Sequence, residues 1–118
     1  MTIKREELDA GRVDLKDVTT GKRIPPAHPG EILREDFLGP MGISVYALAN
    51  AIKVPRSRVN DIVRGRRAIT ADTALRLARY FGTTPEFWMN LQARYDLETA
   101  RDEKGREIEK RVTPLDAA

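Results

Sequence analysis

The amino-acid sequence predicts an all-α domain of five helices, with a flexible arm before it and a short tail or strand after it. Apolar residues recur at helical spacing from residue 32 onward. Residues that favour the N-cap position precede three of these runs, at Ser44, Thr70 and Thr84, and glycines follow two of them, at positions 65 and 82. With 118 residues, the chain has room for one small domain and its tails.

Composition narrows the class of protein. The chain has no cysteine and one histidine, so we expect neither a disulfide framework nor a metal site. No apolar run is long enough to span a bilayer and no secretory signal is found, which is compatible with a cytoplasmic protein without membrane contact. The sequence also contains no convincing acid–base pair or phosphate loop, so we expect no enzyme and no cofactor.

Residues 1–27 differ from the rest of the chain. They mix charges of both signs and contain few apolar residues. Such a segment cannot bury much apolar surface, so we predict an arm that is flexible alone or lies on a partner. A disordered leader without a function is the alternative.

The domain itself is predicted over residues 28–100. Its first helix is expected to begin around His28, because Pro29 suits the first helical position. Gly39 and Pro40 are expected to end it. The predicted inward residues of this helix are Ile32, Leu33 and Phe37.

Two short helices joined by a tight turn are predicted between Ser44 and Gly65. Ser44 is expected to cap the first, and the small side chain of Ala49 lets the two helices cross closely. The second is predicted over about residues 55–64, with Pro55 at its start and Gly65 after its end. This arrangement is typical of a helix-turn-helix, which places its second helix in the major groove of DNA.

The charge of this stretch favours the same interpretation. Six basic residues and one acidic residue lie between Lys53 and Arg67, while the whole chain has a net charge of only +3. A local excess of positive charge is expected where phosphates bind. Arg66 and Arg67 follow the second helix, where a loop would pass close to the DNA backbone. A solvent-exposed basic surface without a ligand is the alternative.

The last two helices complete the predicted core. Thr70 is expected to cap a helix whose inward stripe is Ala74, Leu75, Ala78 and Phe81. Thr84 and Pro85 are expected to open the fifth helix, which continues to about residue 100. Phe87 and Leu91 of this helix are predicted to close the core.

A surplus of apolar residues near the end of the chain predicts a subunit contact. A domain of this size cannot easily bury every aromatic and apolar side chain of the fifth helix. Residues 106–118 alternate charged and apolar residues, which predicts an exposed tail or a short strand. Residues 101–118 are therefore expected to form a C-terminal tail and a candidate dimerisation element. The residues assigned to a dimer interface are Trp88, Met89, Tyr95, Ile108 and Val112.

The stretch from Ser44 to Gly65 resembles the helix-turn-helix of Cro and the phage repressors. From about Pro25 to Pro114 the chain resembles the HigA-type antitoxins of bacterial toxin–antitoxin modules. The segments that carry this resemblance, besides the helix-turn-helix, are PPAHPGEILREDFL (25–38), GRRAITADTALRLARYFGTTPEFWMNLQARYDLETA (65–100) and RVTPL (111–115). The chain departs from the phage-repressor pattern at Pro55, where a serine or threonine cap is usual.

The resemblance implies an antitoxin that neutralises a RelE-like mRNA-cleaving toxin. It also implies a homodimer that binds its own operator, a double-stranded DNA site, and represses transcription. A stand-alone helix-turn-helix regulator without a toxin partner is the alternative. A small toxin-like reading frame beside the gene would discriminate between the two.

Site residues follow from the resemblance, position by position. The candidates for reading base edges are Arg56, Ser57, Asn60 and Asp61. Arginine can bridge guanine O6 and N7, asparagine can pair with adenine, and an acid can accept from cytosine N4. The candidates for phosphate contacts are the backbone N–H of Ser44 and the side chains of Arg58, Arg64, Arg66 and Arg67.

Overall fold

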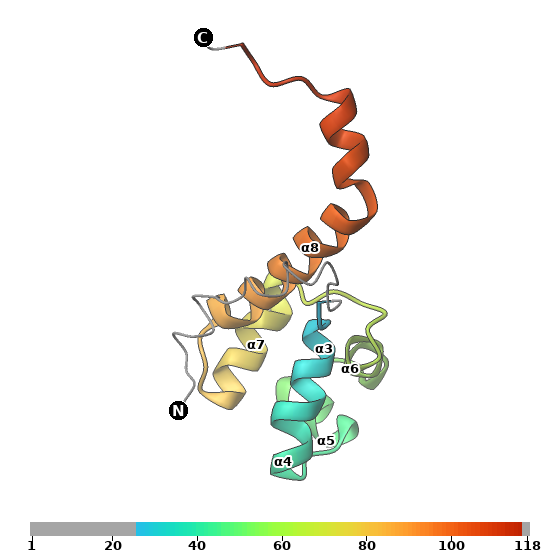
Figure 1. Cartoon of the computed structure of the whole chain (residues 1–118). Helices are drawn as coiled ribbons and strands as arrows, with labels where there is room; N and C mark the ends of the chain where they lie inside the picture. Colours follow the sequence, from blue (N-terminus) through green and yellow to red (C-terminus); the bar gives the residue numbers. More distant parts are fainter. Residues whose placement is uncertain (1–25, 117–118) are drawn as a thin grey trace.

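The computed structural model describes residues 26–116, which form helices and no strand (Figure 1). The elements are α3 (Pro29–Ile32), the π-helical η1 (Leu33–Leu38), α4 (Gly39–Met41), α5 (Val45–Ile52), α6 (Arg56–Val63), α7 (Ala71–Phe81) and α8 (Pro85–Arg111). Because α3, η1 and α4 follow one another without a break, they form one first helix, and the five predicted helices are confirmed. The predicted arm lies outside the described residues, apart from its last two.

The first helix begins as predicted and ends later than predicted. His28 is its N-cap, and the Nδ1 atom of its ring accepts a hydrogen bond from the Gly30 N–H at 2.8 Å. The helix continues past Pro40 to Met41. Pro40 has no N–H to bond back into the helix. The wider π turn of η1 comes directly before it, with the Gly39 N–H bonded to a carbonyl five residues back, and accommodates the proline.

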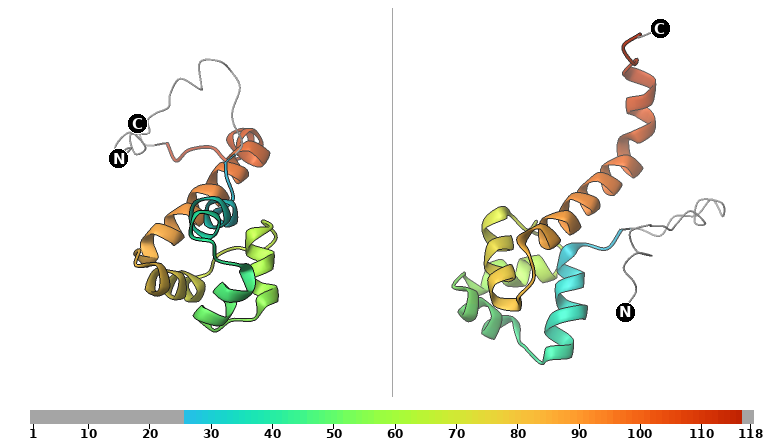
Figure 2. Two further views of the ribbon diagram at one scale, coloured as in Figure 1. Left: turned by 90° about the horizontal axis from the view of Figure 1, so that it is seen from below. Right: turned by 90° about the vertical axis from the view of Figure 1, so that its left-hand side faces the viewer.

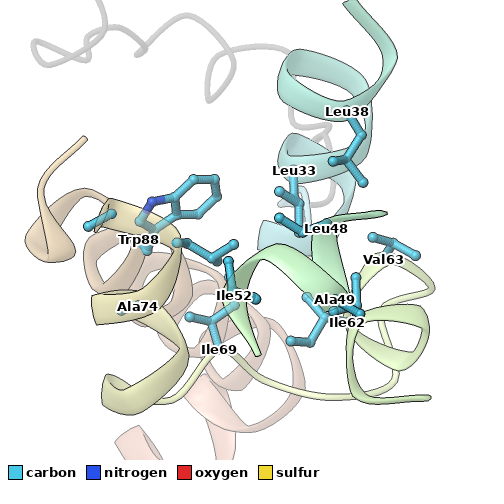
Figure 3. Packing of buried hydrophobic residues seen from close by; sticks show 13 residues of the cluster. Leu33, Leu38, Leu48, Ala49, Ile52, Ile62, Val63, Ile69, Ala74 and Trp88 are labelled. Carbon is cyan, nitrogen blue, oxygen red and sulfur yellow. The ribbon is translucent and has the colours of Figure 1, made fainter. Parts of the chain in front are cut away.

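The helices enclose one apolar core (Figure 3). α5 packs on α6 and α7, α7 packs on α8, and α3 packs on both α6 and α8. The buried members of this core are Leu33, Leu38, Leu48, Ala49, Ile52, Val59, Ile62, Val63, Ile69, Ala74, Leu77, Ala78 and Trp88. α8 extends beyond this body, and its second half projects away from it (Figures 1 and 2).

On two helices, one residue predicted to point inward is exposed, although the rest of the predicted stripe on α7 (Ala74, Ala78 and Phe81) is buried or packs against the core. On α7, Leu75 is 58% exposed, whereas Leu77 is fully buried. On α8, Phe87 is exposed and Trp88 is fully buried, and the Trp88 indole N–H donates to the Thr83 hydroxyl at 2.8 Å. A tryptophan can be buried where its N–H finds an acceptor. Trp88 is therefore a core residue, and its assignment to a dimer interface is wrong.

The tail is shorter than predicted because α8 continues to Arg111. Residues 101–111 are rich in Arg, Lys and Glu, which favour helices even without an apolar face. Ion pairs between Arg101 and Glu98 at 3.2 Å and between Arg111 and Glu107 at 3.5 Å join neighbouring turns. Residues 112–116 follow without helix or strand.

The His28 cap makes the stability of the fold depend on pH. Burial lowers the pKa of His28 below its ordinary value of 6.5, although the carboxylates of Asp96 and Glu31 partly oppose this shift. The unfolded chain therefore binds the proton more readily than the folded chain. The stabilising contribution is complete above about pH 6.5 and is lost as the pH falls through the lower pKa of the folded state.

We expect this dependence to be absent from His28→Asn, because asparagine caps a helix without titrating. Urea unfolding of the wild type and the variant at a series of pH values checks it. The free energy of unfolding should fall more steeply below about pH 6.5 in the wild type than in the variant. Parallel pH profiles would show that His28 does not link protonation to folding.

Candidate nucleic-acid interface

α5 and α6 form the helix-turn-helix that the sequence predicts. The Ser44 hydroxyl caps α5 by accepting from the Ala47 N–H at 3.0 Å. Lys53 ends α5 in the left-handed conformation, with φ at +63°, which turns the chain sharply toward α6. Pro55 occupies the N-cap position of α6 and makes no side-chain hydrogen bond there. The second helix, hereafter the recognition helix, therefore begins at Arg56.

The recognition helix has one buried and one accessible face. Val59, Ile62 and Val63 are buried in the core. On the other side, Arg56 and Ser57 are exposed, and Asn60 and Asp61 are half-buried. Positions 56, 57, 60 and 61 follow helical spacing, so the four predicted base-reading residues share one face.

Two contacts from the first helix fix the position of the recognition helix. Gly30 lies so close to the Ile62 carbonyl that a Cβ atom there would be 1.7 Å from the oxygen. Arg34 donates from Nη1 to the Val63 carbonyl at 3.3 Å, which satisfies one of the free carbonyls at the helix end. Sequence reasoning missed both contacts, because the partners lie about thirty residues apart and neither makes a local pattern.

The predicted phosphate-binding arginines fall into two groups. The first group lies after the recognition helix and is exposed: Arg64, Arg66 and Arg67. Gly65, with φ at +77°, turns the chain between them. Arg58 is different, because it is half-buried and its guanidinium lies 3.7 Å from the Asp72 carboxylate of α7. Arg58 thus connects the recognition helix to α7.

Asp72 belongs to a small network that also supports α5. Its carboxylate accepts from the Arg76 guanidinium at 2.9 Å. Arg76 in turn donates to the Ile52 carbonyl at 2.8 Å. These bonds hold the end of α5 against α7, and they keep the turn before the recognition helix in place.

A buried glutamine, which sequence reasoning missed, holds the segment after the recognition helix. The Gln92 Oε1 atom accepts from the Ile69 N–H at 2.7 Å, and its Nε2 atom donates to Asp96 at 2.9 Å. Glutamine is usually exposed, so nothing in the sequence marks this one as part of the core. The bond ties the loop that carries Arg66 and Arg67 to α8.

The remaining residues assigned to a dimer interface lie at or near the surface of the described chain. Met89, Ile108 and Val112 are exposed. Tyr95 is half-buried, with its ring centre 4.8 Å from that of His28. Unlike Trp88, all four remain accessible to a second subunit.

In the part of the chain that the structure describes, no helix is long and apolar enough to cross a membrane. The same residues contain no group of three or more His, Cys, Asp or Glu side chains that could hold a metal ion.

Comparison with known proteins finds one matching family and several similar proteins. The model of the helix-turn-helix family matches residues 33–88. Virulence-associated protein I of Dichelobacter nodosus is 57% identical over 88 residues, which are 74% of this chain and 82% of that protein. Antitoxin HigA-1 of Vibrio cholerae serotype O1 is 43% identical over 90 residues, which are 76% of this chain and 84% of that protein.

A solved structure extends the similarity to three dimensions. Antitoxin HigA of Pseudomonas aeruginosa, solved with the higBA promoter, is 56% identical to this chain with a TM-score of 0.75. The match covers 76% of this chain and 98% of that chain.

Proposed function

Because the chain belongs to the HigA-type antitoxins, a family of helix-turn-helix proteins, we propose that it binds the operator of its own gene as a homodimer and represses transcription. We further propose that it neutralises a RelE-like toxin that cleaves mRNA. The family comprises DNA-binding antitoxins and transcription regulators and is not a class of enzymes. The proposal depends above all on one observation, the accessible polar face of the recognition helix beside a basic loop.

The chemistry of this face suits a DNA major groove. The groove admits an α-helix, and the side chains of Arg56, Asn60 and Asp61 match the hydrogen-bonding edges of three different bases. Arg66 and Arg67 stand just beyond the helix, where their positive charges can meet phosphates. The related HigA of Pseudomonas aeruginosa was solved with promoter DNA, which supports the same use of the fold here.

Measurements of DNA binding can distinguish the proposed base contacts from the proposed phosphate contacts. We expect Arg56→Ala to weaken binding to a duplex from upstream of the gene by about 1–3 kcal/mol, with little loss on random DNA. Arg66→Ala/Arg67→Ala should weaken binding to both duplexes and reduce the salt dependence, because phosphate contacts release counterions. Titrations of each duplex at several salt concentrations measure both effects.

Arg79→Ala is the matched control for the change in charge, because Arg79 is exposed in the last turn of α7 and outside the proposed interface. Its binding should equal that of the wild type. An equal loss for Arg56→Ala on the two duplexes would make Arg56 a phosphate contact. A wild type without preference for the upstream duplex would contradict the proposed operator function.

Dimerisation is part of the proposal because one recognition helix offers too few base contacts to select an operator. Two copies place their recognition helices about one turn of DNA apart on a palindrome. α8 is the proposed pairing surface, since its second half projects from the body (Figure 2). It exposes Leu97 and Ile108, and the exposed Val112 follows it. Residues 83–118 contain six basic and eight acidic side chains, so this surface does not suit phosphates.

Two deletions test how the roles are divided. Removing residues 101–118 should weaken dimerisation and operator binding together. Removing residues 1–24 should leave the dimer intact and weaken toxin capture, because we propose that the arm folds onto the toxin. Light scattering measures the dimer, and rescue of growth on co-expression with the neighbouring toxin-like gene measures capture.

A full dimer after the C-terminal deletion would contradict the role of α8. Unchanged rescue after the N-terminal deletion would contradict the role of the arm. If the full-length chain binds its operator but rescues no toxin, the chain is a stand-alone regulator.

A further inference from the structure

A tyrosine on the neighbouring helix contacts the first residue of the recognition helix. We propose that Tyr46 is a positioning residue, which holds the Arg56 guanidinium ready to read a base edge. Tyr46 is the second residue of α5 and is 58% exposed. The guanidinium carbon of Arg56 lies 5.4 Å from the centre of its ring. The inference rests on the operator binding proposed above and deepens it.

The contact leaves the recognition chemistry of Arg56 free. A cation–π contact attracts the positive charge of a guanidinium to the ring and occupies no hydrogen-bond acceptor. The guanidinium N–H donors are the groups that bridge guanine O6 and N7. Among the described residues no carboxylate pairs with Arg56, in contrast to Arg58 with its Asp72 partner. The ring can therefore orient Arg56 without competing with DNA for its hydrogen bonds.

Both partners stand at rigid helix starts. The Ser44 cap fixes the first turn of α5, which carries Tyr46. Pro55, with φ at −63°, fixes the chain directly before Arg56. Between the two starts lies a hollow lined by Ser44, Val45, Tyr46, Pro55, Arg56, Ser57 and Asn60. A base edge or phosphate that approaches the recognition helix at this hollow would meet both Tyr46 and Arg56.

The expected effect of this contact is a smaller loss of side-chain conformational entropy when Arg56 binds DNA. A free arginine side chain has many rotamers, and fixing it in a complex costs conformational entropy. A side chain that already contacts an aromatic ring has lost part of this freedom before DNA binds. Tyr46 should therefore increase affinity for the operator only through Arg56, and it should affect random DNA little.

A double-mutant cycle in the full chain tests this coupling. Tyr46→Leu should weaken binding to the upstream duplex by about two- to fivefold, the range of an exposed cation–π contact. In the Arg56→Ala background the same change should have no effect. Tyr46→Phe keeps the ring and should bind almost as the wild type does.

The proton signal of the Arg56 side-chain Nε–H gives a second measurement without DNA. It should show a ring-current shift in the wild type and in Tyr46→Phe, and lose it in Tyr46→Leu. Thermal unfolding should be nearly unchanged in all three, because Tyr46 lies at the surface.

The outcomes distinguish the two proposals. If the wild type prefers the upstream duplex but the losses from Tyr46→Leu and Arg56→Ala are additive, Tyr46 does not position Arg56 and the inference is overturned alone. An absent ring-current shift in the wild type also overturns it alone. If the wild type shows no preference for the upstream duplex, the proposed operator function is contradicted, and so is the proposed role of Tyr46 and Arg56 in reading a base.

Discussion

Replacing Trp88 by alanine is expected to destabilise the fold by about 3–5 kcal/mol, the usual cost of truncating a large buried aromatic residue. The Trp88 ring is fully buried, and its centre lies 5.0 Å from the ring centre of Phe37 and 4.9 Å from that of Phe87. The change would also leave the Thr83 hydroxyl without the indole N–H that it accepts. Urea unfolding followed by circular dichroism measures the loss.

Leu75→Ala is the matched control, because Leu75 is a large apolar residue that is 58% exposed on α7 and is not assigned to the dimer interface. Its free energy of unfolding should change by less than about 1 kcal/mol. If Trp88→Ala leaves unfolding unchanged and instead dissociates a dimer, Trp88 lies at a subunit contact after all, and the core described above is wrong.

Local chemistry explains why the helix boundaries could be predicted. Each of the hydroxyl N-caps accepts a backbone N–H within its own helix, at 3.0 Å for Ser44, 3.4 Å for Thr70 and 3.1 Å for Thr84. The partners are three residues away, so the sequence alone contains the whole interaction. The same holds for Gly82, which ends α7 in the left-handed conformation.

The inward face of α8 could not be predicted in this way. Phe87, Trp88 and Met89 are consecutive large apolar residues, so helical periodicity does not decide which of them points inward. The choice depends on Phe37 and Thr83, which meet the Trp88 ring and its N–H. Tertiary contacts therefore decided the face of the helix. The helical conformation of residues 101–111 was missed because a charged segment without an apolar face has no periodicity to detect.

At the candidate site, too, the local features could be predicted and the tertiary contacts could not. The exposure of Arg56 and Ser57 on the recognition helix follows from the spacing of its buried residues, and it was predicted. The contacts that orient this helix were not predicted, since Tyr46 is ten residues from Arg56 and Gly30 is more than thirty from Ile62. Whether the face reads bases stays a prediction that the operator titrations test.

The closest of these contacts gives the second large effect. Gly30→Ala is expected to destabilise the domain by about 3 kcal/mol or more, at the upper end of the cost of overpacking. The added Cβ would lie 1.7 Å from the Ile62 carbonyl oxygen. The backbone fixes the position of both atoms, so no side-chain rotation can relieve the overlap. α3 and the recognition helix would have to separate. Thermal unfolding should show a large decrease in the melting temperature.

Gly105→Ala is the matched control, because it makes the same chemical change within the second half of α8. There the added Cβ would lie 3.6 Å from the Arg101 side chain, an ordinary contact. Alanine favours a helix over glycine, so this variant should be as stable as the wild type or up to about 1 kcal/mol more stable. If Gly30→Ala lowers the stability and Gly105→Ala does not, Gly30 is required for the close approach of the first helix to the recognition helix. A Gly30→Ala protein that unfolds like Gly105→Ala would contradict that approach, and with it the placement of the recognition helix.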